Sequence, residues 1–539
     1  MDDVDLLLTN GRFYDDGGWL PDTDTLAIRD GRIVAIGSDL PATGEIVDLR
    51  GGWVVPGFHD AHVHPVQAGL EMNACDLSAG AGVDDYLATI AAHAAAHPDE
   101  PWILGGGWSM DAFPGGVPTA EPLDRVVPDR PVFLPNRDHH SAWVNTAALR
   151  LAGVDQATPD PADGRIERDP HGHPTGALHE GAMEIVRALI PPATAAQQRD
   201  ALLTAQAHLH SFGIVGWQDA LVGEGLGMAD SLDTYLAASS DGALTAKVVG
   251  ALWWDRRRGD EQIDELVARR ARAAAAGFDA GSVKIMQDGV CETFTAAVVD
   301  PYLDAHGRAT DNHGISFIEA ADLARYVQRL DALDFQVHVH ALGDRAVRDS
   351  LDAIEHAVTV NGRRGNRHHL AHVQIVRPDD VPRFAALGVA ATVQALWACL
   401  DDQMVDLTLP FLTEDARRQQ YVFRSLADAG AAIACGSDWP VSSPDPLAAI
   451  HVAVNRRAPG SDLPALLDEQ GLTVVESLEA YTRGSAAINR RGQTSGRIAV
   501  GLAADLAVLD RDLLAVPVDE ISTVRVTRTY VDGRLVFSA

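Results

Sequence analysis

The sequence predicts an α/β protein: a (β/α)₈ TIM barrel with a small β-sandwich domain built from both termini and an insertion after barrel strand 1. Three observations predict this fold class. The middle of the chain alternates apolar, strand-like runs with helical stretches rich in Ala, Leu and Arg. Both ends are rich in short strands and turns. Polar residues recur where the strand-like runs of the middle end, which is where such barrels carry their active sites.

Length and composition limit the classes of partner. At 539 residues, 46% of them hydrophobic, the chain can form one large domain with attachments. A formal net charge of −33 would repel nucleic acid and anionic membranes. We therefore expect a small-molecule substrate and neither a nucleic-acid nor a membrane partner, and a homodimer stays open as the state of assembly.

The cysteines and the start of the chain indicate the compartment. The four cysteines are far apart and form no CxxC pair, so neither a disulfide framework nor a thiolate zinc site is expected. Met1-Asp2-Asp3 is acidic where a secretory signal would be basic, and no charge-free apolar run is long enough to span a bilayer. A cytoplasmic protein is expected.

The two ends of the chain have the same character. Residues 1–53 consist of short predicted strands and turns, with Asn10-Gly11 and Asp30-Gly31 typical of tight hairpins. Near the C-terminus, strands are predicted at 496–500, 504–509, 524–531 and 532–537. Because strands need partners, the two ends are expected to pair in one sandwich. The predicted domains are 1–53 and 492–539 for the sandwich and 54–491 for the barrel.

Eight strand-like runs account for the barrel. They are 54–64, 213–219, 246–252, 282–288, 336–340, 368–374, 389–394 and 431–438. The long gap between the first two, about 66–210, has strands of its own at 101–108 and 131–135. We interpret it as an insertion that forms a lid or side domain over the barrel mouth.

The first barrel strand carries a His-x-His pair. Residues two apart on a strand point to the same side, so His62 and His64 can hold one divalent metal ion between two neutral imidazoles. His59 has the wrong parity to join them, whereas Asp60 shares their face. Two histidines can also simply hydrogen-bond in a core, so the pair needs further ligands to make a metal site.

Polar residues at the ends of other barrel strands supply these ligands. On strand five we prefer His340 to His338 because it comes last, and on strand six His372 to His368 for the same reason. Strand eight ends in Asp438 and strand four carries Lys284. Strand ends of a parallel barrel meet at one mouth. The predicted metal ligands are His62, His64, Lys284, His340, His372 and Asp438.

Lys284 is an unusual ligand because a buried ammonium is costly and repels a metal. A buried lysine with a lowered pKa can, however, attack carbon dioxide, and the resulting carbamate has two oxygens that can bridge two metal ions. The alternative is an ion pair of Lys284 with Asp288 or Asp438, and the sequence leaves both interpretations open.

This pattern of His-x-His, lysine, two histidines and aspartate resembles the amidohydrolase superfamily. Segments 57–64, 283–289, 340–346 and 436–441 are similar to its YtcJ-type branch, the amidohydrolase 3 family, which includes N-substituted formamide deformylase. The resemblance covers nearly the whole chain, including 138–145 and 501–506. Two departures are Ala371, where that branch commonly carries Glu, and Gln287, in a position that is usually apolar.

The resemblance implies a hydrolase of carbon–nitrogen bonds other than peptide bonds. Its substrate would be an amide such as an N-substituted formamide, attacked by metal-activated hydroxide, with Asp438 as the catalytic proton shuttle. The cofactor implied is one or two divalent ions, most often zinc. His62, His64 and Asp438 would hold one ion, His340 and His372 the other, and carbamylated Lys284 would lie between them. Candidate substrate contacts are His140, Trp108 and Asp288, although core or loop packing explains each of them too.

Other functions stay open on the same scaffold: a decarboxylase or deaminase of the superfamily, or a non-catalytic ligand-binding or regulatory protein. Deaminases of this type carry a Glu soon after the strand-five histidine, whereas His340 is followed by Ala-Leu-Gly-Asp. A regulatory protein is expected to lack some ligands. Metal content and turnover of an amide would separate these functions.

Overall fold

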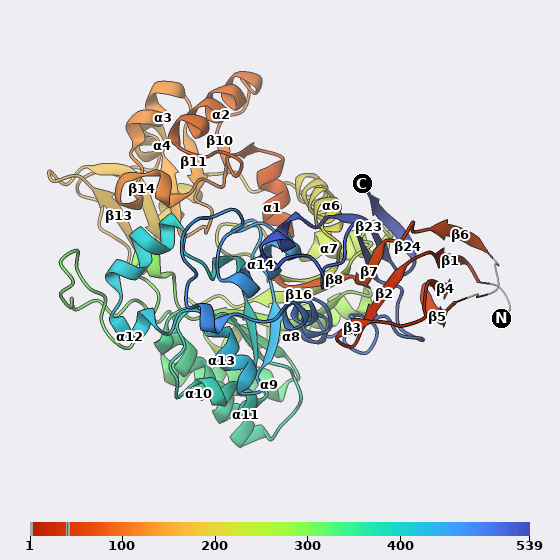
Figure 1. Cartoon of the computed structure of the whole chain (residues 1–539). Helices are drawn as coiled ribbons and strands as arrows, with labels where there is room; N and C mark the ends of the chain where they lie inside the picture. The colour runs from red at the N-terminus through yellow and green to blue at the C-terminus, as the bar shows by residue number, and fades with distance from the viewer. Residues whose placement is uncertain (1–3, 39, 41–43) are drawn as a thin grey trace.

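The computed structural model describes residues 4–38, 40 and 44–539, so Met1–Asp3 of the acidic start lie outside the described residues. Its centre is an eight-stranded parallel sheet in the order β21-β20-β19-β18-β17-β16-β15-β8 (Figure 1). Helices separate consecutive strands along the chain and surround the sheet. The predicted (β/α)₈ fold is confirmed.

The barrel strands lie close to the predicted runs. They are β8 (Phe58–Val63), β15 (Ile214–Val222), β16 (Lys247–Trp253), β17 (Asp279–Met286), β18 (Gln336–Ala341), β19 (His369–His372), β20 (Ala390–Val393) and β21 (Ala432–Cys435). The surrounding helices are α6 (Ala195–Ser211), α7 (Leu232–Ser240), α8 (Ile263–Ala275), α9 (Ala320–Ala332), α10 (Asp344–Asn361), α11 (Val381–Leu387), α12 (Glu414–Arg417), α13 (Phe423–Asp428), α14 (Pro446–Asn455), α15 (Val474–Glu479) and α16 (Ser485–Ile488). On α10, Val347, Leu351 and Ile354 recur every three or four residues and are buried, so one face of the helix packs on the strands.

The barrel closes between its first and last strands through backbone hydrogen bonds. The amide of Asp438 donates to the carbonyl of His62 at 2.8 Å, and the amide of His64 donates to the carbonyl of Trp439 at 2.9 Å. The two chains approach so closely that a Cβ at Gly436 would lie 2.7 Å from the backbone nitrogen of His62. The closure therefore brings the His-x-His pair directly beside Asp438.

The first barrel strand is shorter than predicted. Residues 54–56 belong instead to β7 (Trp53–Pro56), which pairs with a C-terminal strand. The chain turns at Gly57, where a Cβ would lie 2.3 Å from Val215, and then enters β8. The Pro-Gly pair thus divides the predicted strand between two sheets.

The two ends of the chain form two sheets, with the strand orders β24-β23-β22-β7-β2-β3 and β5-β4-β1-β6. Phe13, Val54 and Leu506 share one apolar core with residues of the other sheet, such as Leu8 and Ile28, so the predicted sandwich is confirmed. Figure 1 shows the first strands, in red, beside the last, in blue. The remaining bounds are β1 (Leu6–Thr9), β2 (Arg12–Asp15), β3 (Gly18–Trp19), β4 (Thr25–Arg29), β5 (Arg32–Gly37), β6 (Glu45–Asp48), β22 (Leu506–Leu509), β23 (Val526–Val531) and β24 (Arg534–Ser538).

Two local predictions in the sandwich have different outcomes. Asp30-Gly31 joins β4 to β5 as a tight hairpin, with both residues at positive φ, as expected. Asn10-Gly11 does not make a hairpin, because β1 and β2 belong to different sheets. The predicted strand at 496–500 is also wrong: this segment is a loop whose Ile498 side chain fills the sandwich core.

The insertion after strand β8 has its own sheet, in the order β13-β14-β12-β11-β10-β9, and stands as a separate orange lobe in Figure 1. The predicted strands at 101–108 and 131–135 correspond to β10 and β11. Its elements are β9 (Cys75–Asp76), α2 (Val83–Ala96), β10 (Ile103–Gly106), α3 (Ala120–Val126), β11 (Val132–Pro135), β12 (Ser141–Val144), α4 (Thr146–Leu151), β13 (Gly164–Arg168), β14 (Pro174–Glu180) and α5 (Met183–Arg187).

The ends of the 66–210 range pack with the barrel. Val66 and Ala68 of α1 (Pro65–Met72) and Leu202 of α6 belong to the large core cluster of the barrel. The division of the chain into domains at 53/54 and 491/492 stays a prediction.

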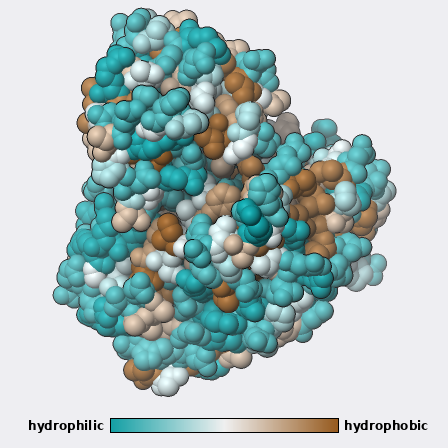
Figure 2. Space-filling model, turned by 90° about the vertical axis from the view of Figure 1, so that its left-hand side faces the viewer, coloured by the Kyte–Doolittle hydropathy of each residue, from teal (hydrophilic) through white to brown (hydrophobic). Residues whose placement is uncertain are grey.

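The surface, the helices and the cysteines can be compared with what the composition predicts. The face drawn in Figure 2 is mostly hydrophilic, with scattered apolar spots. Among the described helices, none is long and apolar enough to cross a membrane. All four cysteines are free and buried.

Candidate metal centre

Four predicted ligands meet at the point where the barrel closes. The Nε2 atoms of His62 and His64 lie 3.0 and 3.1 Å from Oδ1 of Asp438. Nδ1 of His372 lies 3.9 Å from Oδ2 of the same carboxylate. Side chains from the end of β8, from the residue that follows it and from the end of β19 therefore converge on Asp438, which lies in the loop after β21.

The polar atoms of this cluster fit a bound cation. Oδ1 of Asp438 makes no hydrogen bond of acceptable geometry to either imidazole, and both ring nitrogens of His372 lack a partner among the described residues. Buried polar atoms without partners are costly. His62, His372 and Asp438 each offer one atom, and these atoms lie within 4.8 Å of one another. Imidazole and carboxylate suit borderline divalent ions such as zinc, so the donor set fits the predicted metal.

His340 lies beside this group. Its ring centre is 4.4 Å from that of His372. Its Nδ1 lies 3.1 Å from Oδ1 of Asp288, which leaves Nε2 available as a ligand. An imidazole held by a carboxylate in this way is a common arrangement at metal sites.

Lys284 is buried at the same place, with Nζ 3.5 Å from Nε2 of His62. Burial lowers the pKa of this lysine from 10.5 to about 7. Among the described residues it forms no ion pair within 4.0 Å, so the alternative pairing with Asp288 or Asp438 is not present. A neutral amine next to the ligands is the form required for carbamate formation.

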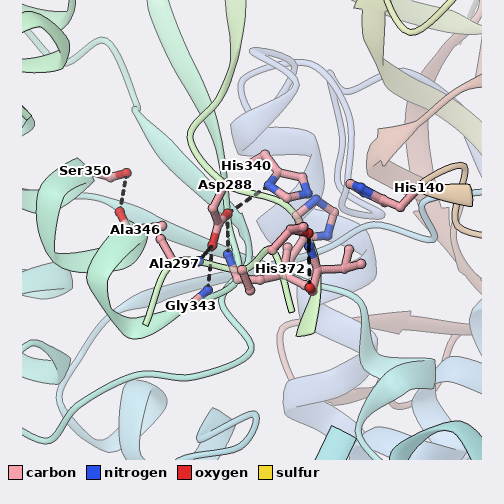
Figure 3. A network of polar contacts seen from close by, with 12 residues as sticks. His140, Asp288, Ala297, His340, Gly343, Ala346, Ser350 and His372 are labelled. Carbon is pink, nitrogen blue, oxygen red and sulfur yellow. Dashed lines mark hydrogen bonds and ion pairs between the residues drawn. The ribbon is translucent and has the colours of Figure 1, made fainter. Parts of the chain in front are cut away.

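Asp288 has a different role from the one predicted. Its carboxylate accepts hydrogen bonds from the amides of Ala297, Leu342 and Gly343 at 3.0, 3.1 and 2.8 Å, in addition to its contact with His340 (Figure 3). It is fully buried. The protein itself thus occupies both oxygens, and Asp288 positions His340 and the following loop instead of facing a substrate.

His140 reaches the cluster from the insertion. In Figure 3 its ring points toward His340 and His372, and its centre lies 6.0 Å from that of His340. Its Nδ1 lies 2.8 Å from Oε1 of Glu180. Burial alone would lower the pKa of His140, but the Glu180 carboxylate raises it to about 9. The structure therefore brings His140, paired with Glu180, to the edge of the cluster.

Trp108 does not join the site. Its side chain is completely buried in the core of the insertion, and its Nε1 donates to the carbonyl of Leu134 at 2.7 Å. It packs edge-on against Phe113, with ring centres 5.2 Å apart. Trp108 was expected to line a pocket because it is large and follows three glycines. It lies instead in an apolar core whose other side chains come from distant parts of the insertion.

Two buried polar residues of interest, Glu180 and Gln394, are not among the residues predicted from the sequence. Gln394 directly follows β20, is 1% exposed, and has no partner for either atom of its amide among the described residues. The alternation of strand residues places it on the face of Thr392, whose hydroxyl contacts His369 inside the barrel. Parity within the run 389–394 could have identified Gln394 as a residue of the mouth, whereas nothing local indicates Glu180.

The sequence of this chain is similar to known proteins over nearly its whole length. The sequence profile of the amidohydrolase family matches residues 45–537. "Protein LONG AFTER FAR-RED 3" of Arabidopsis thaliana is 31% identical over 99% of this chain and 92% of its own length. "Putative amidohydrolase YtcJ" of Bacillus subtilis is 29% identical over 96% of both chains. "N-substituted formamide deformylase" of Arthrobacter pascens is 28% identical over 94% of this chain and 93% of its own.

A solved structure extends the similarity to the fold. An uncharacterised metal-dependent hydrolase from Pyrococcus furiosus superposes with a TM-score of 0.69 at 25% identity, over 94% of this chain and 99% of that one.

Proposed function

The chain belongs to the amidohydrolase family, and on that basis we propose that it hydrolyses a non-peptide carbon–nitrogen bond, with amides such as N-substituted formamides as the substrate class. The observation that carries the proposal is the cluster at the barrel closure, where two imidazole nitrogens lie 3.0 and 3.1 Å from one carboxylate oxygen that has no hydrogen-bond partner among the described residues. The name of the Arthrobacter pascens relative supports formamides as the first compounds to test.

We propose a site for one or two divalent ions, with zinc preferred. A bound divalent ion polarises a substrate carbonyl and lowers the pKa of water. His62, His64 and Asp438 would hold one ion, and His340 and His372 a second. Lys284, as its carbamate, would lie between the two sets, and a mass increase on this residue after exposure to bicarbonate is the direct readout.

The residues around the ions have separate tasks. Asp438 lies at the centre of the cluster and is placed to take a proton from the attacking water and to deliver it to the departing nitrogen. Without that proton the amine would leave as a strongly basic anion. His140, held cationic by Glu180, is placed to donate a hydrogen bond to the carbonyl oxygen as negative charge develops there.

Gln394 completes the proposed substrate site. Its buried amide offers one donor and one acceptor with no partner among the described residues. An amide substrate has the complementary groups, a carbonyl and an N–H. A primary role in substrate binding explains why this polar side chain is kept at a buried position.

Particular residues favour hydrolysis of an amide over the rival functions. The acid nearest to His340 along the following turn is Asp344, but its oxygens bind the amide of Val299 at 2.9 Å and Arg377 at 3.2 Å, so it is not free to act as the proton donor of a deaminase. A regulatory protein would not need the unpaired ligand atoms. Decarboxylation uses the same ligands and is therefore an outcome of the test.

The test measures amine release by zinc-reconstituted protein from N-substituted formamides, other acyl amides, cyclic amides and ureas. Release that disappears in Asp438→Asn, in protein that keeps its fold, would support the proposal and identify the acyl group. No release from any of these compounds, by protein shown to contain zinc, would contradict it. Carbon dioxide evolution from matched carboxylates would then indicate a decarboxylase.

A further inference from the structure

The interior of the barrel contains a hydrogen-bonded polar chain that ends at a metal ligand. Such interiors are normally filled by branched apolar residues, yet here six strands contribute polar side chains that are at most 1% exposed. A buried polar network stabilises a protein only if every member is paired. The members are His62 on β8, Gln218 on β15, Ser282 on β17, Gln336 and His338 on β18, His369 on β19 and Thr392 on β20.

Gln336, at the end of the hydrogen-bonded chain farthest from His62, fixes the direction of its hydrogen bonds. Nε2 of Gln336 lies 2.8 Å from the carbonyl of Arg367 and 3.0 Å from that of Ile488. Carbonyl oxygens only accept, so this atom must be the NH₂ group. Oε1 of Gln336 then accepts from Nε2 of Gln218 at 3.0 Å. The orientation of both amides is thereby determined, and Oε1 of Gln218 must face the histidines.

Two imidazoles donate to that single oxygen. Nδ1 of His338 lies 2.7 Å and Nε2 of His369 lies 3.1 Å from Oε1 of Gln218, and each must carry its proton there because the oxygen has none to give. Among the described residues, the ring nitrogens of His338 contact only Oε1 of Gln218 and Nδ1 of His62, and no carboxylate pairs with this ring, so it is a neutral imidazole with a single N–H. Nε2 of His338 is consequently an acceptor.

The last link reaches the metal ligand. Nδ1 of His62 lies 2.8 Å from Nε2 of His338. Because the latter accepts, Nδ1 of His62 must donate, and its Nε2 is left with a lone pair that faces Asp438 and Lys284. We propose that Gln336, Gln218 and His338 are positioning residues whose ordered hydrogen bonds fix His62 in the tautomer that binds a metal through Nε2. This inference rests on the metal site of the proposed function.

The opposite tautomer of His62 shows why the hydrogen-bonded chain matters for metal binding. With its proton on Nε2, His62 would turn an N–H instead of a lone pair toward Oδ1 of Asp438, 3.0 Å away, and could not bind a cation through that atom. Histidine partners of this kind typically change metal affinity 10–100-fold when removed. The polar core thus keeps the lone pair of His62 directed toward the other candidate ligands.

The test uses the full-length protein labelled with ¹⁵N-histidine, with and without zinc. We expect the His62 signals, assigned by their loss in His62→Gln, to show a proton on Nδ1 before and after zinc is added. In His338→Leu, zinc affinity measured against a chromophoric chelator should fall by 10–100-fold. The control His210→Leu removes a buried histidine that contacts the carbonyl of Ile214 and the hydroxyl of Thr245, neither of them a member of the hydrogen-bonded chain, and should bind zinc like the wild type.

The outcomes separate this inference from the proposed function because neither readout requires a substrate. A proton on Nε2 of His62 in the zinc-free wild type would overturn the inference, and so would unchanged zinc affinity in folded His338→Leu. The wild-type spectrum decides the question even if the variant does not fold. A proton on Nδ1 of His62 and weakened zinc binding in His338→Leu, found in protein that hydrolyses no amide, would contradict only the proposed function.

Discussion

Asp438 and Asp60, at the barrel mouth, both close the barrel and position candidate metal ligands. Asp438 has a positive φ of 56°, donates its amide to the carbonyl of His62, and directs its carboxylate at three imidazoles. Asp60 is comparable: its buried carboxylate accepts from the amide of His62 at 2.9 Å and from the hydroxyl of Ser437 at 2.6 Å. The residues that close the barrel are therefore also those that place the ligands, so a change at either one affects both.

Gln394 leads to a prediction at the scale of one residue. Gln394→Leu removes a buried amide that has no partner in the part of the chain that the structure describes, so we expect the free energy of unfolding to rise by about 1 kcal/mol. The same change should lower kcat/KM at least tenfold, since a substrate amide loses its hydrogen bonds. Chemical denaturation and steady-state kinetics measure the two effects.

Gln206→Leu is the matched control for Gln394→Leu. The Gln206 side chain is buried but fully paired with the backbone of residues 243, 245 and 246, far along the chain from the ligands. Its replacement should destabilise the fold and leave kcat/KM unchanged. Equal destabilisation of both variants would contradict the assignment of Gln394 to the substrate site.

At the scale of elements, the insertion contributes to the site through one pair. His140 lies in the loop between β11 and β12, and Glu180 ends β14, so one sheet of the insertion carries both. The hydroxyl of Thr295, from the loop after β17, donates to Glu180 at 2.9 Å. This contact ties the insertion to the barrel next to the ligands.

The pair predicts a pH-dependent stability. The folded-state pKa of His140, about 9, lies above its ordinary value of 6.5. Its stabilisation is therefore fully present below pH 6.5 and is lost as the pH rises through 9. Glu180→Gln should lower the free energy of unfolding by on the order of 2 kcal/mol at pH 6. At pH 10, where His140 is neutral, loss of the pair should lower it by almost nothing. Thermal unfolding of both proteins across this range measures the difference.

Glu100→Gln serves as the control for that experiment. Glu100 also contacts a histidine, His93, at 3.2 Å, but its side chain is 45% exposed. An exposed pair contributes little, so this variant should differ from the wild type by less than about 1 kcal/mol at every pH. A cost of Glu180→Gln that stays constant up to pH 10 would contradict a cationic His140.

At the scale of the whole molecule, the ligands connect the first strand of the barrel to the last ones. His62 and His64 come from the beginning of the barrel, while His372 and Asp438 come from more than 300 residues later in the chain. A metal bound among them would join the two edges that only a few backbone hydrogen bonds close.

Removal of the metal should therefore destabilise the entire barrel. Binding to the native state alone contributes RT ln(1 + [L]/Kd), about 4 kcal/mol at a thousandfold excess over Kd. We expect chelation to lower the Tm by several degrees and zinc to restore it, as measured by calorimetry. His64→Asn, which lacks one ligand, should respond much less to either treatment. A Tm that does not depend on zinc in the wild type would contradict a metal at this closure.

The sequence alone determined the repeating pattern of the fold and predicted which polar residues lie together at the mouth of the barrel. Alternating apolar runs and helices predict a (β/α)₈ barrel because each element must bury one face. His62, His64, His340, His372 and Asp438 could be identified because strand parity and strand ends are local properties, and parallel strands bring their ends to one mouth.

Only the tertiary structure decided the features that depend on distant partners. Trp53–Pro56 continues directly into the first barrel strand in sequence, yet it pairs with β22 near the other end of the chain. Trp108 and Asp288 have residue types that are common in substrate sites. Apolar side chains of the insertion enclose Trp108, and backbone amides from other segments hydrogen-bond the carboxylate of Asp288. The orientation of Gln218 is set by Gln336, 118 residues away. Hydrogen-bond direction and enclosure are properties of such pairs, and the fold alone brings their members together.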